Sequence, residues 1–188
     1  MTDSTLNPKL IAAGLIDAFE GRSKVTREDA TKFLQEYFMV RLPAKRLKES
    51  EEFISQIEEK NRNNADFGRT ESGLLYQIIR PGSSERPTSE LDKVRVTYVG
   101  TFKNGTEFDS SKDTVEFALN RVIRGWTEGL QLIGKGGEIR LWIPPDLAYG
   151  QYGRGNIGPN EALVFDINLI DFTPAQTQEE TPAMSPGM

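Results

Sequence analysis

Histidine and cysteine are both missing from the 188 residues of this chain. Their absence excludes Ser-His and Cys-His nucleophilic catalysis, disulfides, and zinc sites built on thiolate or imidazole ligands. Ser110 and Ser111 therefore have no histidine base, and we interpret them as turn or strand-edge residues. The sequence predicts neither a bound metal ion nor a cofactor.

Positive charge and long apolar runs are also scarce. The formal net charge is -5 and the isoelectric point is about 5.0, whereas a nucleic-acid-binding protein needs a basic surface. No apolar run approaches the length of a membrane span, and the first residues lack the apolar core of a signal peptide. We therefore expect a cytoplasmic protein, or a periplasmic or cell-envelope protein if the N-terminus is truncated.

Before residue 70 the pattern is helical. A first helix is predicted from Pro8, with Asn7 as its N-cap, to Gly21. Thr26 and Asp29 form a weak capping box that opens a second helix. The apolar faces of the two helices either form a subunit interface or pack on each other. A helical part this small has a limited core of its own, which makes burial by a partner plausible.

A third, longer helix is predicted from Pro43 into the asparagine-rich stretch 61–64. Its apolar residues are sparse among many lysines, arginines and glutamates. A helix this polar is typical of an exposed connector between domains.

From Gly73 onward the apolar period becomes two, which predicts strands. Asn104-Gly105 is a strong hairpin signal, and residues 125–132 can form only a short helix. The expected strands are residues 74–79, 94–102, 115–119, 138–143 and 163–172. This pattern predicts an α+β domain in which an antiparallel sheet wraps one short helix. Residues 173–188 are rich in Thr, Pro, Gln and Glu, which favours a disordered tail.

Five short motifs lie in order between Tyr98 and Phe165. They are residues 96–100, 108–111, 122–126, 148–150 and 164–166. Each places an aromatic ring beside a turn or strand end, and several rings with few polar groups indicate an apolar ligand pocket. Taken singly, the rings fit an ordinary core equally well. We expect Trp142 and Phe117 to pack in the core.

On these motifs, residues 73–172 resemble an FKBP-type peptidyl-prolyl cis-trans isomerase domain. Residues 6–68 resemble the N-terminal domain of the bacterial macrophage-infectivity-potentiator-like branch of that family. The resemblance implies an all-α N-terminal domain joined by a long helix to the antiparallel sheet. The implied domains are a helical dimerisation or chaperone-like part at 1–68, an isomerase part at 69–172 and the tail at 173–188.

The resemblance also implies a pocket for proline, position by position. Trp126 would form its floor. Its walls and sides would be Tyr98, Phe108, Phe165, Val122 and Ile123, with Tyr149 and Ile157 from the long loop before the last strand. In the family, a backbone N–H matching Ile123 and a hydroxyl matching Tyr149 hold the substrate backbone. Asp109 would lie at the rim, held by the Tyr98 hydroxyl.

Three features depart from the family's pattern. Val115 stands where an aromatic residue is expected, and residues 154–156 are more polar than in some relatives. In the bacterial branch another helix usually precedes the one at Pro8. We expect that the start is truncated or that the protein dimerises differently.

The implied function is a peptidyl-prolyl cis-trans isomerase that assists protein folding. Its partners would be proline-containing folding proteins, macrolides such as rapamycin and, through the N-terminal helices, a second copy of the chain. Rotation of an amide needs no nucleophile, so the missing histidine and cysteine are consistent with it. The alternatives are a non-catalytic chaperone and an assembly module with the same fold.

Overall fold

The computed structural model describes residues 13–14, 16–18, 20–22 and 26–175. Its chain forms two compact units that divide between Pro43 and Ala44. The expected helix start at Pro8 and most of the expected tail lie outside the described residues. The predicted functional domains at 1–68, 69–172 and 173–188 stay predictions.

The first unit contains the helix α2 (Arg27–Glu36) and the π-helical turn η1 (Tyr37–Arg41). The predicted cap is present, because the backbone N–H of Asp29 donates to Thr26 Oγ1 at 3.1 Å. Tyr37 is buried. Several other large apolar side chains of this unit are exposed, namely Phe33, Leu34, Phe38, Met39 and Val40.

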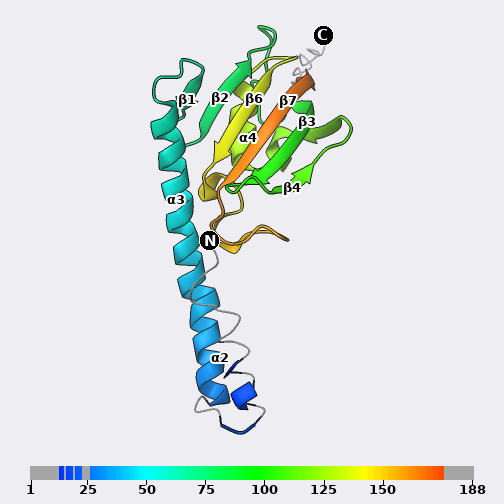
Figure 1. Cartoon of the computed structure of the whole chain (residues 1–188). Coiled ribbons are helices and arrows are strands. Elements are labelled where there is room, and N and C mark those ends of the chain that lie inside the picture. The colour runs from blue at the N-terminus through cyan, green and yellow to red at the C-terminus, as the bar shows by residue number, and fades with distance from the viewer. Residues whose placement is uncertain (1–12, 15, 19, 23–25, 176–188) are drawn as a thin grey trace, which may run out of the picture. The chain divides into compact units, whose positions relative to one another are not determined.

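The second unit is built on one seven-stranded sheet. Its strands are β1 (Phe67–Arg69), β2 (Leu75–Arg80), β3 (Lys93–Phe102), β4 (Glu107–Ser110), β5 (Val115–Ala118), β6 (Glu138–Ile143) and β7 (Leu163–Thr173). Every pairing is antiparallel, in the order β1-β2-β6-β7-β3-β4, with β5 also on β3 (Figure 1). The predicted α+β fold class is confirmed.

Five of these strands follow the predicted segments within one or two residues. The predicted hairpin joins β3 to β4, and Gly105 takes a φ of 83° that a residue with a side chain rarely adopts. The amide of Thr106 donates to Asn104 Oδ1 at 2.9 Å and fixes the turn. Strands β1 and β4 were not predicted, because each contains a single large apolar residue, a phenylalanine, and so shows no alternation.

The short helix α4 (Arg124–Gly129) packs against one face of the sheet, where the main core lies (Figure 1). A Cβ added at Gly125 would lie 2.6 Å from Ile143, and one at Gly129 would lie 2.6 Å from Leu141. Glycine at both positions lets the helix backbone approach β6 closely. Short 3₁₀ turns complete the connections: η2 (Leu119–Arg121), η3 (Leu130–Leu132), η4 (Pro145–Leu147) and η5 (Gly150–Tyr152).

A second, smaller core joins α3 (Leu42–Asn61) to the sheet. Ile54 of α3 is buried together with Leu75, Trp142 and Ala162. The interpretation of Trp142 as a packing residue is confirmed. One stripe of this mostly exposed helix is therefore buried, which its sparse apolar residues did not predict.

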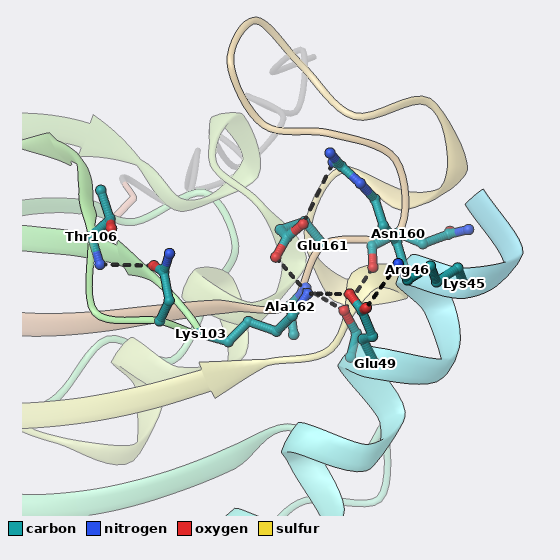
Figure 2. A network of polar contacts seen from close by, with 10 residues as sticks. Lys45, Arg46, Glu49, Lys103, Thr106, Asn160, Glu161 and Ala162 are labelled. Atoms are coloured by element: carbon teal, nitrogen blue, oxygen red, sulfur yellow. Dashed lines mark hydrogen bonds and ion pairs between the residues drawn. The ribbon is translucent and has the colours of Figure 1, made fainter. Parts of the chain in front are cut away.

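Polar contacts fasten the same helix to the loop that precedes β7, residues 148–162 (Figure 2). Ser50 is fully buried, and its hydroxyl donates to the carbonyl of Asn160 at 2.7 Å and accepts from the amide of Ala162 at 3.0 Å. Both loop groups would otherwise need another partner away from water.

Glu161 adds charge to this contact. It accepts a hydrogen bond from Lys103 at 2.7 Å and faces Arg46 of α3 at 3.6 Å (Figure 2). Lys103 also reaches Glu49 at 3.8 Å. We refer to the contacts among Arg46, Glu49, Ser50, Lys103 and residues 160–162 as the α3–loop network.

Candidate active site

A cavity of about 750 Å³ is lined by residues of α4, of the strands β3, β4, β5 and β7, and of the 148–162 loop. Its volume lies in the range of small-molecule and peptide side-chain sites. Its aromatic lining consists of Tyr98, Phe108, Phe117, Trp126, Tyr149 and Phe165.

Trp126 lies at the base of this cavity, on the first turn of α4, and only 4% of its surface is exposed. Its ring meets Tyr98, Phe165 and Phe117 edge-on, with centroids 4.9, 5.2 and 5.9 Å away. Such edge-to-face contacts are the favoured geometry of aromatic pairs. The indole N–H is buried and has no hydrogen-bond partner among the described residues. Apart from this N–H, the ring presents apolar surface to the cavity.

Phe108 and Phe165 form one wall, with their rings edge to face at 5.5 Å. Behind them, Gly100 of β3 leaves the space that both rings occupy. A Cβ at that position would lie 2.7 Å from Phe165 and 2.8 Å from Phe108. The glycine of the first motif thus shapes the wall.

A tyrosine–aspartate pair forms the rim. The Tyr98 hydroxyl donates to Asp109 at 2.8 Å. Burial, together with the hydrogen bond and the negative charge of Asp109, raises the pKa of Tyr98 to about 12. The amide of Tyr98 donates to Ser111 Oγ at 2.9 Å, which confirms a strand-edge role for that serine.

Two further hydrogen-bond donors at the cavity have no partner among the described residues. Ile123 lies in an extended conformation just before α4, and its backbone N–H donates to no described residue. The Tyr149 hydroxyl likewise has no hydrogen-bond partner within the described part of the chain. The guanidinium of Arg154 lies 5.9 Å from the centre of the Tyr149 ring, within cation–π range.

All nine predicted site residues line this one cavity: Tyr98, Phe108, Asp109, Val122, Ile123, Trp126, Tyr149, Ile157 and Phe165. Their roles in catalysis stay predictions. Phe117 was expected in the core, but it also lines the cavity and contacts Trp126 and Tyr98. Val115 does not line it. Val115 and Phe117 lie on the same strand, and Phe117 is the one that supplies an aromatic ring to the cavity. From its spacing in the sequence alone, this ring could not be distinguished from a core residue.

Residues 84–170 match the family described as FKBP-type peptidyl-prolyl cis-trans isomerase, and residues 1–78 match the domain amino terminal to it. A probable FKBP-type peptidyl-prolyl cis-trans isomerase of Haemophilus influenzae is 39% identical over 175 residues, which cover 87% of this chain and 72% of the relative. This chain belongs to the FKBP-type peptidyl-prolyl cis-trans isomerase family. The predictions of the family and of an isomerase that assists protein folding are confirmed.

Two further relatives extend the likeness to most of the chain. The crystal structure of FkpA from Escherichia coli is 37% identical and superposes with a TM-score of 0.68, covering 91% of this chain and 84% of that one. The outer membrane protein MIP of Legionella longbeachae is 37% identical over 88% of this chain and 75% of its own length. Within the described residues, this FKBP-type chain has no helix both long and apolar enough to cross a bilayer.

Proposed function

We propose that the cavity binds the proline of an X-Pro segment and accelerates rotation of the preceding amide in folding proteins. The observation that carries this proposal is the aromatic floor and walls around Trp126, with two unused backbone-binding donors at the edge. In this arrangement Phe108, Phe165, Val122 and Ile157 enclose the ring of the bound proline.

The energetics of the reaction suit such a cavity. Rotation about the peptide bond faces a barrier of about 18–20 kcal/mol because twisting removes amide resonance. The cis and trans forms differ by only about 0.5–1 kcal/mol, so nothing has to be driven uphill. Shortening a process of tens of seconds to milliseconds lowers the barrier by about 5–6 kcal/mol.

Removing water from the amide supplies part of that difference. The planar amide is charge-separated and is stabilised by water, so a dry aromatic cavity favours the twisted form relative to the planar one. The Ile123 N–H and the Tyr149 hydroxyl hold the flanking backbone while the bond turns. The carboxylate of Asp109 orients the Tyr98 hydroxyl and keeps that hydroxyl protonated.

A proline-limited refolding assay tests this function. The intact chain should shorten the slow, proline-dependent phase of a refolding protein in proportion to enzyme concentration, without changing the final yield. A chaperone that only holds its client would change the yield but leave that rate alone. Equal slow-phase rates with and without the protein would contradict the proposal.

The pH dependence of the reaction should follow the pKa of Tyr98. A folded-state pKa of about 12 lies above the ordinary value of 10.0, so the neutral phenol is favoured by folding. The contribution of the Tyr98 hydroxyl to the stability of the fold is complete below about pH 10 and is lost as the pH rises from there toward 12. We expect kcat/KM for a short proline peptide to stay level from neutral pH to about pH 10. A fall centred well below that pH would show that Tyr98 titrates earlier.

We propose in addition that the exposed apolar side chains of α2 and η1 take part in a subunit interface. Phe33, Leu34, Phe38, Met39 and Val40 would otherwise leave a sizeable apolar surface in water. Light scattering of the intact chain measures this directly, and the mass of a monomer at micromolar concentration would contradict it.

A cell-envelope location is the one that we propose, in preference to the cytoplasm. Its support is the relative named as an outer membrane protein. Binding of a macrolide such as rapamycin would use the same aromatic cavity. Fractionation of the source cells tests the first proposal, and competition of rapamycin with a proline peptide tests the second.

A further inference from the structure

The mouth of the proline cavity carries an excess of positive charge. Three arginines line it, Arg121, Arg124 and Arg154, against a single carboxylate, that of Asp109. This carboxylate already accepts a hydrogen bond from the Tyr98 hydroxyl. The whole chain has the opposite balance, with 23 basic and 28 acidic residues.

These three arginines make no ion pair with any residue that the structure describes. Several arginines elsewhere in the same domain do, as Arg140 with Asp166, Arg80 with Glu138 and Arg69 with Glu58 show. Arg86 and Arg95 also lack an ion pair among the described residues, but neither lines the cavity, whereas Arg121, Arg124 and Arg154 all do.

Their positions bracket the place where a proline would lie. Arg121 and Arg124 flank the segment Val122-Ile123, which lines the cavity. The backbone N–H of Ile123 has no acceptor among the described residues. Arg154 lies on the 148–162 loop, over the Tyr149 ring. Its backbone pairs with Ile157 in both directions, at 2.8 and 2.9 Å, so the tip of the loop is a closed turn.

Two acidic residues, Glu90 and Glu128, line a separate hollow of about 350 Å³, which Arg124 also borders. Glu128 accepts a hydrogen bond from Ser72 at 2.6 Å. Neither carboxylate is within ion-pair distance of Arg124, but both border the same hollow and partly offset the positive charge of Arg124. Arg121 and Arg154 do not border that hollow, so their positive charge is offset less.

We propose that Arg121, Arg124 and Arg154 select substrates that carry an aspartate or glutamate next to the proline. The inference rests on the proposed isomerase function of the cavity and names the class of segment that it prefers. A carboxylate on a residue that flanks the bound proline comes to the rim, where guanidinium groups can donate paired hydrogen bonds to it. The same field favours the approach of acidic segments from solution.

The test uses the intact protein and short peptides that differ only at the residue beside the proline: glutamate, glutamine or lysine. One series places this residue before the proline and the other after it. Since a single exposed ion pair contributes little, three together should favour glutamate over glutamine by about three- to tenfold in kcat/KM in at least one series at low salt. In 1 M salt the Debye screening length shortens to about 3 Å, so the glutamate-to-glutamine ratio of kcat/KM should fall below about twofold.

A triple variant with Arg121→Gln, Arg124→Gln and Arg154→Gln should bring the glutamate-to-glutamine ratio close to one at every salt concentration. The matched control is Arg86→Gln, an exposed arginine away from the cavity, which should keep the wild-type ratio. A wild-type ratio of one in both series, or a preference that survives in the triple variant, would overturn the inference. Failure to accelerate any peptide, the glutamine peptides included, would overturn the proposed function and this inference with it.

Discussion

Replacing Trp126 by alanine is expected to lower kcat/KM for a proline peptide at least about tenfold, because the floor of the cavity and its contacts with three rings disappear. The cavity left behind should also reduce the free energy of unfolding by about 3–5 kcal/mol. Peptide isomerisation followed by NMR exchange, at a temperature where the variant is folded, measures the first effect. Urea unfolding measures the second.

Trp142→Ala is the matched control for this change. Trp142 is equally buried, but it packs on the opposite face of the sheet with Ile54 of α3. We expect a comparable loss of stability and nearly unchanged activity on short peptides. If both variants lost activity to the same degree, the loss would reflect general destabilisation and the floor role of Trp126 would be refuted.

Ser50→Ala should weaken the loop that supplies one side of the cavity, although Ser50 is distant from it in sequence. The change removes both bonds of a fully buried hydroxyl and leaves the amide of Ala162 buried without that acceptor. The expected cost is about 1–3 kcal/mol of unfolding free energy. Because the same loop carries Tyr149 and Arg154, we also expect a severalfold rise in KM.

Trypsin offers a direct readout of this effect, because Arg154 lies exposed at the tip of the loop. Cleavage after Arg154 should be faster in the Ser50→Ala variant than in the wild type. Ser55→Ala is the control on the same helix, since Ser55 is exposed and its hydroxyl, among the described residues, bonds only to the carbonyl of Glu51 one turn earlier. Equal cleavage rates in the two variants would show that the α3–loop network does not hold the loop.

The strands with a clear period of two could be predicted from sequence, because one buried face imposes alternation over four or more residues. Strands β1 and β4 each hold a single large apolar residue and so show no alternation. The buried stripe of α3 also escaped prediction. Ser50 and Ile54 are ordinary residues in a polar helix, and their burial depends on partners around residues 142 and 160–162, far along the chain.

The cavity was easier to predict than the contacts that support it. Its residues lie in short motifs in a fixed order, whereas the α3–loop network consists of common charged and polar side chains. Phe117 illustrates the limit. Alternation places it on one face of its strand, but only the fold brings that face both to the core and to the cavity.

The chain has only two tryptophans, and they lie on opposite faces of the same sheet. Trp126 forms the base of the cavity, whereas Trp142 lies under α3. The intrinsic fluorescence of the protein is therefore the sum of two emitters that monitor separate events. We expect Trp126 to respond to occupancy of the cavity and Trp142 to respond to release of α3 from the sheet. A variant that keeps one of the two tryptophans would then follow one process without an added label.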